Sequence, residues 1–379
     1  MDRDYRIDFF RGVALLLIVA NHIEMFASTY FFKISTKWLQ PGLSDSAEIF
    51  VLLSGYVYGI VYMKNYVRSS FFSTYRKSLV RAKDIYLQNM LTLLILTALV
   101  YLERASIAAD VVLPATMTYA AEHPLQALLW YPTLLLAPEL GNVLPMYIVI
   151  LLFAPFFLYL LRRSVVLGIA ISCAIWVVAS LFPYVDLPTY PYPPQGGWAF
   201  NPFAWQFLFV LGMAIANADF RDSWVVRYRK PLLWFSVAVL LAAFVPRVTY
   251  ILNTQEVLSW HVMGKIPFAK KATLGPMRML HFFSLLYVVA WLLQGRNAWF
   301  ERAWARPVVR AGQSSLEVFC FGVLATYIGY YFYAVMGFTA VNFALVTAAA
   351  WAAILVFAEL IHRRKQFCCQ AARQATANT

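Results

Sequence analysis

Charged residues are scarce in this sequence. They make up only 13% of its 379 residues, whereas hydrophobic residues make up 62% and aromatic residues 17%. Soluble globular domains carry about 25% charged residues, so the composition argues against a soluble enzyme or binding module. Internal repeats, low-complexity tracts and a polar stretch long enough for a soluble domain are also lacking. The sequence therefore predicts an all-α polytopic integral membrane protein.

Cysteines are equally few, and their spacing excludes a disulfide framework or a zinc site. Cys173 and Cys320 fall within apolar segments, and Cys368 and Cys369 lie side by side near the end of the chain. We therefore expect no bound metal. The first apolar run is long, is interrupted by polar residues and lacks a clear small-residue cleavage site, so we expect it to remain as the first helix.

The apolar segments predict about ten transmembrane helices, because a spanning helix needs ~20 mostly apolar residues. With the N-terminus in the cytoplasm, 23 of the 31 Lys and Arg residues fall on the cytoplasmic side. This bias follows the positive-inside rule and places both termini in the cytoplasm. The net charge of +13 thus reflects topology and does not indicate a nucleic-acid partner. We expect one transmembrane domain over 1–362 and a disordered cytoplasmic tail over 363–379, with spans near 9–31, 46–64, 85–102, 144–161, 164–182, 203–217, 231–246, 277–294, 314–335 and 338–361.

The first of these segments carries polar residues that a spanning helix does not keep cheaply. Arg11 lies near its start, and Asn21 and His22 follow ten residues later. At ~1.5 Å per residue, His22 lies ~16 Å beyond Arg11, near the bilayer midplane. An ionisable residue at that depth is a functional-site hypothesis, because a neutral buried imidazole can act as a general base. A structural histidine that joins two helices is the alternative.

The second segment begins with two acidic residues on the outer side, Asp45 and Glu48. These carboxylates could orient an imidazole or bind sugar hydroxyls, or they could simply cap a helix. Further along, Gly55 and Gly59 predict close packing against another helix. The cytoplasmic segment that follows is basic and amphipathic, with Arg76, Lys77 and Arg81 among its cations, a pattern typical of a helix that lies on anionic lipid.

Two outer loops hold further candidates. Residues 182–206 contain no Lys or Arg but are rich in proline and aromatic residues. Such aromatics either anchor the chain at the membrane interface or stack on sugar rings; the candidates for the latter, with nearby amides for hydroxyls, are Trp198, Asn201, Trp205 and Gln206. The second loop breaks the positive-inside pattern with Lys271, and Arg278 and His281 follow it at a helix start. Cations on the outer side suit an anionic ligand or lipid headgroups.

These residues carry a resemblance to a known family. Arg11, ten residues and His22 resemble the first-helix motif of the acyltransferase 3 superfamily. Four further blocks resemble its OpgC branch, which succinylates osmoregulated periplasmic glucans: residues 44–59 (SDSAEIFVLLSGYVYG), 196–206 (GGWAFNPFAWQ), 274–285 (LGPMRMLHFFSL) and 312–322 (GQSSLEVFCFG). Asn21 departs from the pattern, because aspartate usually precedes the histidine in that superfamily.

The resemblance implies an enzyme of the bacterial inner membrane that uses cytoplasmic succinyl-CoA and keeps no permanently bound cofactor. We expect His22 to be the base, with Glu48 holding it. An arginine fork suits a carboxylate, so Arg278, with Lys271 second, is the candidate for the succinyl end. The remaining expected contacts are Arg11, Arg76, Lys77 and Arg81 with CoA, and Asp45, Trp198, Asn201, Trp205, Gln206 and His281 with the glucan.

Several alternatives stay open from the sequence alone. A transporter or flippase also carries buried charges, although it predicts inverted repeats, and none is found. An assembly role in glucan synthesis is a third possibility. Within the enzyme class, the acyl group could be acetyl, the acceptor another polysaccharide, and the transfer direct or through an acyl-histidine. The 312–322 block has no assigned role.

Overall fold

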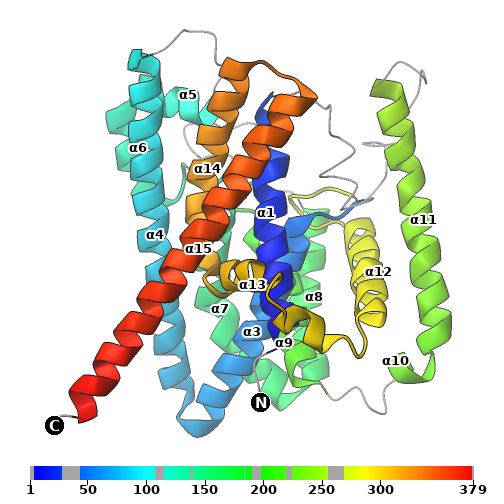
Figure 1. The fold of residues 1–379 in the computed structure, drawn as a ribbon. Helices are drawn as coiled ribbons and strands as arrows, with labels where there is room; N and C mark the ends of the chain where they lie inside the picture. The colour runs from blue at the N-terminus through cyan, green and yellow to red at the C-terminus, as the bar shows by residue number, and fades with distance from the viewer. Residues whose placement is uncertain are drawn as a thin grey trace. The chain divides into compact units, whose positions relative to one another are not determined.

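The structure is a computed structural model that describes residues 4–27, 43–106, 115–136, 140–182, 184–189, 198–218, 224–254 and 269–377. Within these ranges the chain is built from helices joined by short connections, and no strand occurs. Figure 1 shows the helices as ribbons. The chain divides into two compact units, residues 1–36 with 293–379 and residues 37–292, and each is described by itself.

The first unit joins the two ends of the chain. It contains α1 (Tyr5–Ala27), η3 (Asn297–Glu301), α13 (Arg306–Gln313), α14 (Ser315–Met336) and α15 (Ala340–Ala377). Two glycines let α1 and α13 touch along their backbones: a Cβ at Gly12 would lie 2.1 Å from the Val308 oxygen, and one at Gly312 would lie 1.7 Å from the Asp8 oxygen. No larger residue fits at either position without movement of the helices.

Helices α1 and α14 run parallel along their whole shared length. Small residues of α14 face α1, so that Gly322 approaches Val19 and Gly329 approaches Ile23. Further along, the rings of Phe26 and Tyr327 lie 5.1 Å apart. The two helices therefore pack side by side in the same chain direction from Arg11 to the end of α1.

The second unit holds the remaining helices. Gly55 and Gly59 of α3 (Ser46–Arg68) pack against α9 (Pro202–Asn217). A Cβ at Gly55 would lie 2.0 Å from the Phe209 oxygen, and a Cβ at Gly212 would lie 2.2 Å from the Leu52 oxygen. The predicted close packing at Gly55 and Gly59 is thus confirmed. The helices of this unit are α3 (Ser46–Arg68), α4 (Phe71–Ser106), α5 (Ala115–Glu122), α6 (Pro124–Trp130), η2 (Tyr131–Thr133), α7 (Val143–Arg163), α8 (Val165–Leu181), α9 (Pro202–Asn217), α10 (Trp224–Arg227), α11 (Arg229–Thr254) and α12 (Pro276–Leu292).

Side-chain caps set several of these helix starts. Asp45 caps α3 by accepting from Ala47 N, and Glu48 completes a capping box by accepting from Asp45 N. Asn201 caps α9 just before Pro202, which suits the first helical position because its missing N–H would have had no partner there. Ser164 caps α8 directly after α7 ends. Polar residues between apolar segments therefore set the starts of these three helices.

The structure confirms a multi-pass, all-α membrane protein. Seven of the described helices are long and apolar enough to cross a bilayer, and α8, α9 and α12 are shorter apolar helices. Every one of the predicted spans overlaps one of these helices. The number of crossings and the cytoplasmic location of both termini stay predictions.

The structure adds detail to two predicted segments. The basic segment after α3 is not a helix of its own, because α4 begins at Phe71 and runs without a break from that segment into the third apolar span. The 363–379 segment continues α15 as far as Ala377; it includes many good helix formers and no glycine or proline. The division into one domain over 1–362 and a disordered tail stays a prediction, and the described residues form two compact units.

Candidate active site

The predicted site residues divide between the two units. Arg11 and His22 belong to the first unit, and all the others belong to the second. The expected contact between His22 and Glu48 would join the two units, so it stays a prediction.

In the first unit, α1 turns His22 to the side that packs on α14. Val19 and Phe26, one turn before and one turn after His22, contact Gly322 and Tyr327 of α14. Residues three and four apart share a helix face, so half-buried His22 lies on the same face. Nearby, the Glu24 side chain is buried with only 2% exposed, although the sequence interpretation gave it no role.

Arg11 is held at the start of the same helix. Its Nη2 donates a hydrogen bond of 2.5 Å to Ser315 Oγ, the first residue of α14. Lys365 of α15 donates to Ser314 Oγ and to Glu317 Oε1, and thereby binds the same turn from the other side. The 312–322 block, which had no assigned role, therefore organises the helices around Arg11.

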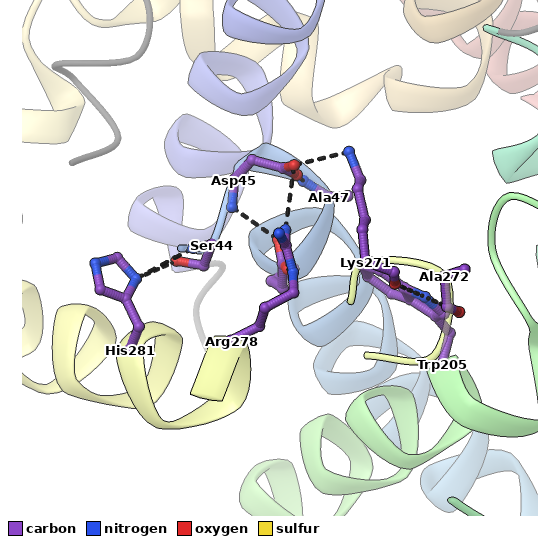
Figure 2. A network of polar contacts seen from close by, with 9 residues as sticks. Ser44, Asp45, Ala47, Trp205, Lys271, Ala272, Arg278 and His281 are labelled. Atoms are coloured by element: carbon purple, nitrogen blue, oxygen red, sulfur yellow. Dashed lines mark hydrogen bonds and ion pairs between the residues drawn. The ribbon is translucent and has the colours of Figure 1, made fainter. Parts of the chain in front are cut away.

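In the second unit, four charged side chains meet at the start of α3 (Figure 2). Arg278 of α12 donates from Nε to Glu48 Oε1 at 2.8 Å and from Nη2 to Asp45 Oδ2 at 3.2 Å. Lys271 Nζ lies 2.7 Å from the same Asp45 oxygen. The side chains of Glu48 and Arg278 are 0% and 10% exposed, whereas those of Asp45 and Lys271 are 31% and 42% exposed. The cluster thus has a buried pair and a more accessible pair.

The two cations of this cluster hold Asp45 in its charged form. Burial raises the pKa of the Asp45 carboxyl, but the positive charges of Lys271 and Arg278 outweigh burial and hold that pKa well below its ordinary value. Asp45 is therefore ionised at neutral pH and binds both cations. The guanidinium of Arg278 is engaged with protein carboxylates, so of the two cations Lys271 is the one more open to an anionic ligand.

His281 adjoins the cluster and is almost fully buried. Its Nδ1 accepts from the backbone N–H of Ser44 at 3.3 Å and lies 2.7 Å from Ser44 Oγ. Because Nδ1 accepts the amide hydrogen, the hydrogen-bond network assigns the ring proton to Nε2. Ser44 contributes to this contact although it was not among the predicted site residues. His281 and Ser44 thus connect α12 to the residues that precede α3.

The two tryptophans expected to bind glucan in the 182–206 segment make contacts within the protein. Trp205 is 0% exposed, and its indole donates to the backbone oxygens of Lys271 and Ala272. Trp198 is also buried and donates to the Pro188 oxygen. Their contact with glucan stays a prediction.

The two amides of that segment are also engaged within the protein. Asn201 caps α9 and donates to the Val185 oxygen, and Gln206 binds the hydroxyl and carbonyl of Ser172. The sequence interpretation missed the contacts with Val185 and Ser172, because these partners lie 16 and 34 positions away along the chain.

The predicted CoA contacts of the second unit lie at the far end of α3. Arg76, Lys77 and Arg81 are exposed on the first turns of α4, and Lys77 binds Asn65 near the end of α3. About 20 residues separate Glu48 from this end, a distance of ~30 Å along a helix. The two polar groups of this unit are therefore a membrane thickness apart. Within the described part of the chain, no group of three or more His, Cys, Asp or Glu side chains could hold a metal ion.

Comparison with known proteins gives one result. A family model described as OpgC protein matches residues 3–366. No curated protein and no solved structure matches the chain. The matched range includes both units and every candidate site residue.

Proposed function

The chain belongs to the OpgC protein family, and from this premise we propose that it is a membrane acyltransferase that transfers a succinyl group from cytoplasmic succinyl-CoA to osmoregulated periplasmic glucans. The observation that carries the proposal is the family match over residues 3–366. The membrane-spanning helices and the buried polar residues along them support it, because such a reaction needs a donor from one side and an acceptor from the other.

The proposed chemistry is an acyl transfer assisted by His22. A neutral His22 takes the proton from a glucose hydroxyl as that oxygen attacks the succinyl thioester. The new C–O bond forms, the C–S bond breaks, and CoA leaves as a thiolate that regains a proton from the imidazolium. General-base assistance of this kind typically contributes ~10²- to 10⁴-fold to the rate.

Donor binding is proposed for the basic residues. Arg11, Arg76, Lys77 and Arg81 would bind the phosphates of CoA, for which charge-assisted hydrogen bonds are well suited. The exposure of Arg76, Lys77 and Arg81 supports this role. The long pantetheine arm would then carry the thioester from the cytoplasmic face towards His22.

Acyl selectivity is proposed for the outer cluster. A succinyl group ends in a carboxylate, and Lys271 is the more exposed of the two cations there. We assign the contact with the succinyl carboxylate to Lys271, while Arg278 keeps the start of α3 in place. This reverses the order in which the sequence ranked the two residues, because Arg278 already binds two protein carboxylates.

The test is replacement of His22 in a strain that makes succinylated glucans. His22→Gln is expected to abolish glucan succinylation, measured by mass spectrometry of periplasmic glucans, while the amount of protein in the membrane stays normal. Asn21→Asp, the adjacent change towards the superfamily pattern, is the matched control and should keep activity. Normal succinylation by His22→Gln would refute the assignment of the base. Unsuccinylated glucans in cells that contain the unaltered protein would refute the proposed function.

A further inference from the structure

The 312–322 block contains two neighbouring serines with different partners. Ser315 is 5% exposed and accepts the hydrogen bond from Arg11 Nη2 at 2.5 Å. Ser314 is equally buried but accepts from Lys365 Nζ of α15 at 3.1 Å. Only the first of these contacts reaches a residue that the proposed function uses.

The direction of the Arg11 contact follows from its chemistry. A guanidinium has five N–H donors and no acceptor, so the Ser315 oxygen must be the acceptor. A hydrogen bond with a charged donor is roughly twice as strong as a neutral one. The contact therefore fixes one edge of the guanidinium.

Close packing of the backbone around Ser315 fixes the position of its hydroxyl relative to Arg11. Gly312 and Gly12 let α13 lie directly against α1, with the Asp8 and Val308 oxygens where side chains would otherwise be. The chain then turns at Ser314 and begins α14 at Ser315. The position of Ser315 relative to Arg11 is thus set by close backbone contact, which tolerates little displacement.

We propose that Ser315 is a positioning residue for Arg11, which orients the guanidinium towards the phosphates of the acyl donor. The inference rests on the proposed function, in which Arg11 binds CoA. A long arginine side chain loses rotamer freedom when it binds a ligand, and a partner that holds it beforehand reduces that loss. The 312–322 block would then assist donor binding by holding Arg11 of α1, without contacting the donor itself.

The experiment measures CoA binding by the purified full-length protein in lipid nanodiscs. Ser315→Ala should weaken CoA binding up to about tenfold, the size expected for the cost of immobilising one long side chain on binding. Ser315→Thr keeps the hydroxyl and should retain most of the affinity. Ser314→Ala is the matched control, because it removes a neighbouring, equally buried hydroxyl that binds Lys365, and it should leave CoA binding unchanged.

A double-mutant cycle separates positioning from a purely structural effect. In an Arg11→Ala background, Ser315→Ala should cause no further loss of CoA affinity, because its effect passes through Arg11. In a transfer assay, Ser315→Ala should raise the KM for succinyl-CoA by a similar factor and leave kcat nearly unchanged. Equal CoA binding by Ser315→Ala and Ser314→Ala, or full additivity with Arg11→Ala, would overturn the inference. Absence of transfer by the unaltered protein, with weakened CoA binding by Ser315→Ala, would refute the proposed function and leave the inference standing.

Discussion

Arg278 and Lys271 show at the scale of single residues how burial separates two similar charges. Both contact Asp45, but only Arg278 also holds Glu48, whose side chain is fully buried. A buried carboxylate that loses its cation becomes an unpaired charge, which costs far more than the loss of an exposed ion pair. The two cations should therefore respond differently to the same substitution.

Arg278→Met is expected to destabilise the protein by about 3–5 kcal/mol, because Glu48 would be left without its cation. Lys271→Met should cost at most about 1 kcal/mol, because that ion pair is more exposed. Thermal unfolding in detergent measures this difference. In transfer assays, Lys271→Met should raise the KM for succinyl-CoA more than that for acetyl-CoA, whereas Arg278→Met should affect both donors alike. A selective loss of succinyl-CoA use in Arg278→Met alone would reverse the assignment.

At the scale of helices, glycine sets how closely each pair can approach. Gly312 lies against the Asp8 backbone in the contact of α13 with α1, and Gly322 lies against the Val19 side chain in the contact of α14 with α1. Backbone atoms cannot move aside as a flexible side chain can. The two glycines belong to the same sequence block, yet they differ in the space available for a methyl group.

Gly312→Ala is expected to destabilise the protein by about 1–3 kcal/mol or more, since its Cβ would lie 1.7 Å from the Asp8 oxygen. Gly322→Ala is the matched control: its Cβ would lie 3.2 Å from Val19 Cγ2, a distance that a small side-chain shift relieves. The melting temperatures of the two purified variants test this difference. Equal melting temperatures would show that the α1–α13 contact is looser than described.

At the scale of the whole molecule, the first unit brings together segments from the two ends of the chain. α1 packs with α13, α14 and α15, which follow it by about 300 residues. α1 alone carries Arg11 and His22, so the position of these two residues depends on helices at the other end of the sequence. The family match covers this whole arrangement.

The predicted topology can be tested with a membrane-impermeant maleimide. Cys368 is exposed on the last turns of α15 and should be labelled only in inside-out vesicles, because the C-terminus is predicted to be cytoplasmic. A cysteine placed at exposed Tyr184, in the loop after α8 that is predicted to lie on the outer side, should be labelled only in right-side-out vesicles. A Cys368→Ser/Cys369→Ser variant provides the background for the second measurement. Labelling of both positions from one side would contradict the topology.

Features that depend on neighbouring residues could be predicted from the sequence. Hydropathy placed a helix in every predicted span, because a membrane-spanning segment must satisfy its own backbone hydrogen bonds. Local patterns also predicted the capping role open to Asp45 and Glu48 and the close packing at Gly55 and Gly59. The polar residues that the sequence singled out at Asp45, Glu48, Lys271 and Arg278 do form one cluster.

The contacts that those residues make depend on how the helices pack. Glu48 and Arg278 are 230 positions apart, and Arg11 and Ser315 are 304 apart. No local pattern encodes such pairs, because they depend on which helices pack together and in what register. For the same reason Trp205 suggested a sugar-stacking residue from its loop composition, whereas its fully buried indole binds the backbone oxygens of Lys271 and Ala272. Local hydropathy and helix capping thus set the elements, and long-range packing set the roles of their polar side chains.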